Sequence, residues 1–213
     1  MKTYQKNITV PRLVIEYDED AENPRADDGN IGIFLTKESQ YKSPDGATHP
    51  LYALMLETEE SAKNTMHHIK LMEDAARKAF KESGPKDGNS HDEGLHIIEI
   101  HPVYRYEHGA VMYKRGKAAG FDYSNCGFFF ITAESLSGGN YTAKKIAKAI
   151  DAELKTYNKW INGEIYAFRL YDEKSGEMIE SCGGFYDIED IREYLPAEWK
   201  KEKLEEYFER GVI

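Results

Sequence analysis

Hydrophobic residues recur every second position in several segments of this chain, which is the spacing of β-strands. This alternation at residues 13–17 and 95–108 predicts strands, and Pro102 either divides the second segment or bends it. A further strand is expected at residues 31–37, paired with residues 13–17. The run CGFFFIT at residues 126–132 is almost entirely apolar. Because both faces of such a strand must be covered, we expect it to be central in a sheet.

In two long segments, hydrophobic residues recur at spacings of three and four residues instead of at every second residue. This spacing predicts amphipathic helices. The first helix is expected over residues 59–81, with Thr58 as its N-cap. The second is expected over residues 142–161, capped by Thr142 and ended by Asn162-Gly163. Residues 51–57 fit either a buried strand or the lead-in to the first helix.

The last third of the chain predicts a hairpin followed by a short helix. Residues 165–172 and 178–186 fit two strands, and the loop between them contains glycine. The segment AEWKKEKLEEYFERG at residues 197–211 predicts a short helix that docks through Trp199 and Leu204. We expect residues 126–186 to form one compact α/β core unit.

These elements predict an α+β fold over residues 1–213. The expected architecture is a single compact domain with a mixed or antiparallel sheet, two main amphipathic helices and a short C-terminal helix. A length of 213 residues fits one such domain or two small ones. A subdomain boundary, if there is one, is expected near residues 83–94, which are rich in Gly, Ser, Asp and Asn.

Charge and cysteine content restrict the class of function. The formal net charge of −10 argues against direct nucleic-acid binding, which needs a basic surface. No apolar run has the length of a signal peptide or membrane span, and two cysteines do not make a disulfide scaffold. We therefore expect a cytoplasmic protein with reduced thiols.

Motifs for metal, phosphate and nucleophilic chemistry are absent or weak. The acidic residues between 18 and 28 could bind Ca²⁺ or Mg²⁺, but they lack EF-hand spacing, so we favour a solvated loop. No HExxH, CxxC or P-loop occurs, and no metal or cofactor is expected. Cys126 and Cys182 are interpreted as small buried thiols rather than nucleophiles. Gly183-Gly184 is interpreted as a bulge or a close backbone approach.

Three groups of short motifs carry a family resemblance. They are Asn23-Pro24-Arg25 with Asp28, Asn30 and Gly32; Tyr106-Glu107-His108-Gly109 with Asn125-Cys126-Gly127-Phe128; and Asn162-Gly163-Glu164-Ile165-Tyr166 with Glu180–Tyr186. Together they resemble an uncharacterised family of small proteins encoded by bacteriophages and other mobile elements. Gly109 and Gly183 stand where that family has Ser and Trp. The resemblance implies an accessory gene acting on host or competitor machinery, and it assigns no catalytic residue.

Three functions are compatible with these observations, of which a structural or housekeeping interaction protein is the least specific. The first is a non-enzymatic phage or mobile-element protein that binds and inhibits a host defence or nucleic-acid-processing protein. Its acidic surface would face a basic nucleic-acid-binding groove in the bacterial cytoplasm. The alternative is an enzyme or binder of a nucleotide-like ligand. Its site would combine Asn23, Arg25, His108, Asp122 and Cys126. Self-association is compatible with either hypothesis.

Overall fold

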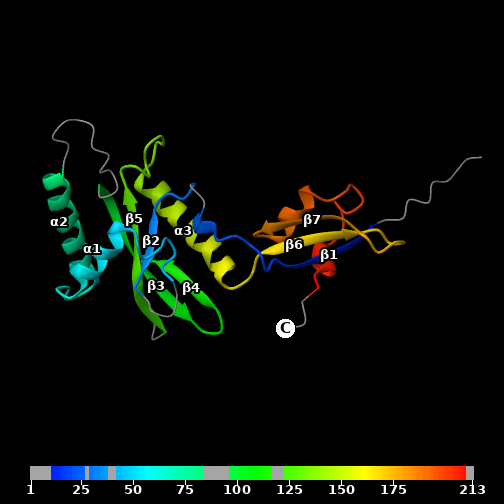
Figure 1. Ribbon diagram of the computed structural model, residues 1–213, viewed down its shortest axis with the longest axis horizontal. Helices are drawn as coiled ribbons and strands as arrows, with labels where there is room; N and C mark the ends of the chain where they lie inside the picture. The colour runs from blue at the N-terminus through cyan, green and yellow to red at the C-terminus, as the bar shows by residue number, and fades with distance from the viewer. Residues whose placement is uncertain (1–10, 27–28, 38–41, 84–95, 117–121, 210–213) are drawn as a thin grey trace, which may run out of the picture. The chain divides into compact units, whose positions relative to one another are not determined.

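The chain folds into two antiparallel sheets with helices, which confirms the predicted α+β class. The computed structural model describes residues 11–26, 29–37, 42–83, 96–116 and 122–209 (Figure 1). The chain divides into two compact units. Unit 1 contains residues 1–23 and 159–213, and unit 2 contains residues 24–158. The predicted boundary near residues 83–94 falls almost entirely outside the described residues, and the two units divide elsewhere.

Unit 2 is built on a four-stranded sheet. Its strands are β2 (Ile33–Thr36), β3 (Ile97–Glu107), β4 (Val111–Arg115) and β5 (Tyr123–Thr132), in the order β2-β5-β3-β4. β5 is central, as predicted, and the side chains of residues 128–131 are fully buried. β3 runs through Pro102 as one strand, with register shifts at Ile97/Glu99 and Val103/Tyr104.

Three helices cover the two faces of this sheet (Figure 1). α1 (Pro50–Glu59) and α2 (Thr65–Ser83) share a core with Phe128 and Phe130. α3 (Ala143–Ile161) packs on the other face, where the Tyr157 ring lies edge-on to Phe34 at 5.7 Å. Neighbouring side chains on a strand point to opposite faces, so β5 supplies both cores.

The first predicted helix is wrong at its N-terminal end. Thr58 lies inside α1, where its hydroxyl donates a hydrogen bond to the Leu54 carbonyl at 2.7 Å. Residues 51–57 belong to α1, which settles the choice that the sequence left open. The chain then turns, and the Asn64 side chain accepts a bond from the His67 N–H at the start of α2. The second helix matches its prediction: Thr142 caps α3, and Gly163 follows its end with a φ of 68°.

Unit 1 is built on a three-stranded antiparallel sheet. Its strands are β1 (Arg12–Tyr17), β6 (Tyr166–Tyr171) and β7 (Met178–Phe185), in the order β1-β6-β7. The predicted hairpin is β6–β7. One face of the sheet packs on two 3-10 helices, η3 (Ile188–Glu193) and η4 (Leu204–Tyr207).

Three predictions about how segments fold and pair need correction. The α-helix predicted over residues 197–211 is not formed in the described part of this segment: residues 197–209 form turns and η4, although Trp199 and Leu204 are buried as expected. Residues 126–186 do not form one unit, because β5 and most of α3 belong to unit 2 and β6–β7 belongs to unit 1. Likewise, β1 and β2 lie in different sheets and do not pair.

Candidate functional site

Arg25, a candidate ligand-binding residue, lies in a hydrogen-bond network inside unit 2. It sits in a 3-10 turn, η1 (Pro24–Ala26), and only 2% of its side chain is exposed. Its Nε and Nη2 bind the two carboxylate oxygens of Asp45 at 2.8 and 2.6 Å. Its Nη1 binds Asn30 Oδ1 at 2.9 Å and Glu153 Oε2 at 2.5 Å, and its Nη2 also reaches the Gly32 carbonyl at 2.6 Å.

This network uses the full hydrogen-bonding capacity of the guanidinium. Arginine has five N–H donors, and the five contacts of Arg25 match that number. The contacts join η1, the residues just before β2, the loop that contains Asp45, and helix α3. An incoming anion would have to displace one of these partners. Arg25 is therefore a structural residue that ties four segments of unit 2 together.

Burial shapes the electrostatics around Arg25. Burial raises the pKa of Glu153, while the Ile31 N–H and the charge of Arg25 lower it. Burial, helped by the negative charge of Asp45, raises the pKa of Tyr157 to about 12. Both groups lie on α3, so the helix presents a carboxylate and a protonated phenol to the interior of unit 2.

Tyr157 gives unit 2 a pH-dependent stability. Its folded pKa lies above the ordinary value of 10.0, so between about pH 10 and 12 the unfolded chain loses this proton and the folded chain keeps it. The free energy of unfolding should therefore fall by about 1.4 kcal/mol per pH unit in that window. Denaturant unfolding from pH 9 upward should show this loss in the wild type relative to Tyr157→Phe. Tyr141→Phe, at an exposed position, is the control, and equal slopes in wild type and Tyr157→Phe would refute the assignment.

The other candidate residues do not converge on Arg25. Tyr106 pairs with Tyr123, so His108 and Asp122 lie at the same end of the β3–β5 pair, both exposed. Cys126 is buried, and its thiol donates to the Val103 carbonyl at 3.3 Å. At about 3.3 Å per residue, Asp122 and Cys126 are about 13 Å apart along the chain.

Asn23 completes the predicted set and lies two positions before Arg25 in the sequence. It is half-buried and assigned to unit 1, whereas the other four candidates belong to unit 2. Asn23 thus lies near Arg25 in the chain, and His108 and Asp122 lie at one end of the β3–β5 pair. The structure does not assemble the five residues into one site.

The acidic loop contributes to folding at its first residue. Asp18 Oδ2 accepts a hydrogen bond from the Gly184 N–H at 2.8 Å. A Cβ at Gly183 would lie 2.2 Å from the same oxygen, and Gly184 has a φ of 83°. The register shift between β6 and β7 at these residues confirms the bulge, the first of the two interpretations of Gly183-Gly184. Asp27 and Asp28 lie outside the described residues, and within the described ones no cluster of His, Cys, Asp and Glu is placed to hold a metal ion.

The two cysteines differ in exposure, which corrects the expectation that both are buried. Cys126 is buried and Cys182 is exposed, and neither forms a disulfide. We expect iodoacetamide to label Cys182 in the native protein and to reach Cys126 only after unfolding, because a buried thiol is shielded from reagents. Peptide mass spectrometry would locate the label. In Cys182→Ser, native labelling should vanish; labelling of Cys126 at the rate of Cys182 would contradict the fold around β5.

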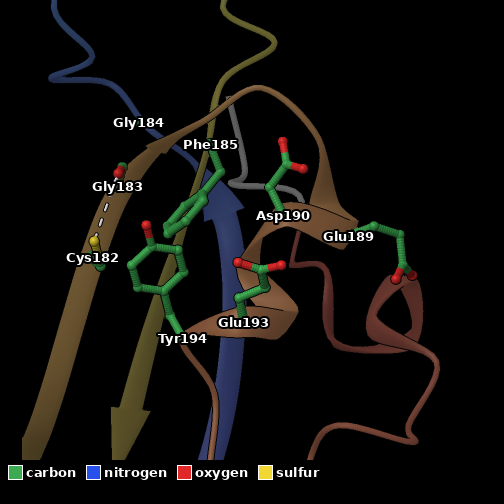
Figure 2. Close-up of a pocket in the computed structure, with 8 residues that line it drawn as sticks. All are labelled: Cys182, Gly183, Gly184, Phe185, Glu189, Asp190, Glu193 and Tyr194. Carbon is green, nitrogen blue, oxygen red and sulfur yellow. Dashed lines mark hydrogen bonds between the residues drawn. The ribbon is translucent and has the colours of Figure 1, made fainter.

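Unit 1 contains a pocket of about 400 Å³ beside β7 (Figure 2). Residues 182–185 of β7 form one side. Glu189, Asp190, Glu193 and Tyr194 of η3 and its end form the other. Tyr194 is 59% exposed, and its ring meets Phe185 edge-on at 5.1 Å. The pocket therefore combines an aromatic surface with several carboxylates.

The carboxylates of this pocket are not equivalent. Hydrogen bonds from Arg192 to both oxygens of Glu189, each at 2.7 Å, hold this side chain and lower its pKa. Within the described part of the chain, Asp190 and Glu193 have no ion-pair partner. These two groups can accept hydrogen bonds from a cationic ligand, and Tyr194 can lie against it.

The pocket lies in unit 1, the more acidic of the two units. Unit 1 has 19 acidic and 11 basic residues, a formal net charge of −8, whereas unit 2 has 19 and 17, a net charge of −2. The net charge of the whole chain does not reveal this asymmetry, whereas a comparison of residues 159–213 with the preceding segments does.

None of the helices in the described part of the chain is long and apolar enough to cross a membrane. The resemblance to phage and mobile-element proteins stays a prediction. Comparisons with protein-family models, with curated proteins and with solved structures found no match to this chain.

Proposed function

We propose that this protein is a non-enzymatic binding protein whose unit 1 recognises a basic surface on a protein partner. The observation that carries the proposal is the concentration of negative charge: unit 1 accounts for −8 of the net −10. Charge of one sign gathered on one unit attracts an oppositely charged surface and accelerates its association. An even distribution would have favoured simple solubility instead.

The environment of the carboxylates supports the same function. Glu180, Asp190 and Glu193 are exposed near β7, where they can meet a partner without prior rearrangement. The alternative of a nucleotide-like ligand has weaker support. Arg25 is the cation that such an anionic ligand would need, and its donors are already occupied by Asp45, Glu153, Asn30 and Gly32.

The resemblance to phage and mobile-element proteins adds a biological context to this proposal. An accessory protein from such an element would act on bacterial host machinery. Host defence and nucleic-acid-processing proteins have basic grooves for phosphate backbones. An acidic unit that occupies such a groove would inhibit its owner by competing with nucleic acid.

Affinity capture from bacterial lysate with two matched variants tests the proposal. The unit 1 variant is Glu180→Gln with Asp190→Asn and Glu193→Gln. The unit 2 control is Glu57→Gln with Glu60→Gln and Asp74→Asn, which removes the same number of exposed charges. We expect wild type and control to capture the same proteins, and the unit 1 variant to lose them.

Salt supplies a second readout in this experiment. Because salt screens exposed charges, recovery with the wild type should fall steadily as ionic strength rises. Capture by the unit 1 variant at the level of wild type would overturn the proposal. Failure of the wild type to retain any protein at low salt would do so as well.

A further inference from the structure

Both edges of the unit 2 sheet are covered by other parts of the chain. At β2, the Phe34 N–H donates to Asp45 Oδ2 at 2.6 Å, and the Phe34 carbonyl accepts from the Asp45 N–H at 3.2 Å. At β4, the side chain of Asn158 binds both the N–H and the carbonyl of Tyr113, at 2.7 and 3.0 Å. Such cover prevents a sheet edge from pairing with another chain.

One edge of the unit 1 sheet is covered in the same way. Ile15 in β1 forms a parallel bridge with Phe208, and its carbonyl accepts the Glu209 N–H at 2.7 Å. The C-terminal segment thus takes the place of a neighbouring strand. On three of the four sheet edges, main-chain groups of the edge strand therefore form hydrogen bonds with residues outside their own sheet.

β7 is the edge that differs. Among the described residues, none outside β6 forms a main-chain hydrogen bond with residues 178–183. All residues from 178 to 184 are exposed, including the apolar side chains of Met178 (57%) and Ile179 (55%). The bulge held by Asp18 keeps the end of β7 against β6. An extended, accessible strand in a fixed register is a template for pairing with another extended segment.

The charges near β7 select its occupant. Glu180 lies on the strand, and Asp190 and Glu193 lie across the pocket from residues 182–185 (Figure 2). A second copy of this chain, paired through its own β7, would bring like charges together, which destabilises a strand pair. A basic segment would instead meet opposite charge along the same edge.

The pocket at the end of β7 fits one side chain of such a segment. Strand side chains alternate between faces, so a segment paired with β7 would direct some of its side chains to the face that holds Tyr194. The aliphatic stem of Lys or Arg can pack along Phe185 and Tyr194, and its charged head can reach Asp190 and Glu193.

We infer that β7 is a docking edge for an extended basic segment of the partner, which adds a fourth strand to the β1-β6-β7 sheet and places a Lys or Arg side chain in the pocket. This inference rests on the proposed function and deepens it. Main-chain hydrogen bonds supply the attachment, and the pocket carboxylates supply the preference for a basic side chain.

A synthetic peptide that alternates lysine and valine is the probe. With the full-length protein, we expect it to slow amide hydrogen exchange in residues 178–183. The same peptide N-methylated at alternate residues keeps its charge but loses half of its N–H donors. We expect it to bind at least about tenfold more weakly, because its backbone cannot complete a ladder. Equal binding of the two peptides would overturn the inference, since charge alone would then explain binding.

Charge variants test the pocket in the same assay. Asp190→Asn with Glu193→Gln should weaken peptide binding about tenfold, whereas the matched control Glu205→Gln with Glu206→Gln on η4 should leave it unchanged. Equal losses in both variants would contradict the pocket assignment. If the unit 1 variant loses its lysate partner but neither peptide result is obtained, the proposed function stands and strand pairing at β7 is wrong.

Discussion

Replacing Arg25 with methionine is expected to lower the free energy of unfolding by about 3–5 kcal/mol. The substitution leaves Asp45 and Glu153 without their buried cation, and removing one partner of a buried ion pair costs that much. Asn30 and the Gly32 carbonyl lose a donor as well. Chemical denaturation of the full chain, followed by circular dichroism, measures the change.

Two further variants show whether geometry or charge alone matters at this position. Arg25→Lys keeps the charge but loses the planar fork, so we expect a loss of about 2 kcal/mol. Arg169→Met breaks an exposed pair with Glu16 and should leave the free energy of unfolding essentially unchanged. If Arg25→Met were as stable as the wild type, Arg25 would be available for a ligand and our structural assignment would be wrong.

Substituting alanine for Gly127 is expected to cost about 3 kcal/mol. Gly127 lies between β2 and β3 in the centre of the unit 2 sheet. A Cβ at this position would lie 2.0 Å from the Leu35 carbonyl oxygen and 2.8 Å from the Thr36 Cα. Both are main-chain atoms of β2, so the strand itself must move, and overpacking of this kind is destabilising.

Gly176→Ala is the matched control for Gly127→Ala. Gly176 has a φ of 70° in the β6–β7 loop, with open space around it. Alanine at this position should lower the free energy of unfolding by only about 1 kcal/mol, the cost of holding alanine in the left-handed backbone conformation. Thermal unfolding of the two variants should rank them in that order. Equal stability of Gly127→Ala and the wild type would show that β2 does not pack against β5 as described.

The local elements of this protein could be predicted because their signals lie close together in the sequence. The cap at Thr142, the stop at Gly163 and the apolar run in β5 act within a few residues, and all three predictions are confirmed. The break between α1 and α2 was missed. Spacings of three and four continue across it, and only the side-chain cap at Asn64 marks the new start.

Long-range relations could not be predicted in the same way. Arg25 and Glu153 are 128 positions apart, and nothing near either residue indicates their pairing. Arg25 therefore looked like a ligand-binding cation when it was considered alone. The division into two units was hidden for the same reason. β1 pairs with β6, and the whole of unit 2 lies between these two strands in the sequence. The pocket beside β7 likewise depends on how η3 folds back on the strand.

Hydrogen exchange of the full-length protein bound to the partner that it captures tests our central claim most directly. The claim is that unit 1 is the recognition surface. We predict that partner binding slows amide exchange in unit 1, most strongly in residues 178–183 of β7, and leaves residues 97–107 of β3 in unit 2 unchanged. Protection centred on unit 2, with unchanged exchange in β7, would contradict the account.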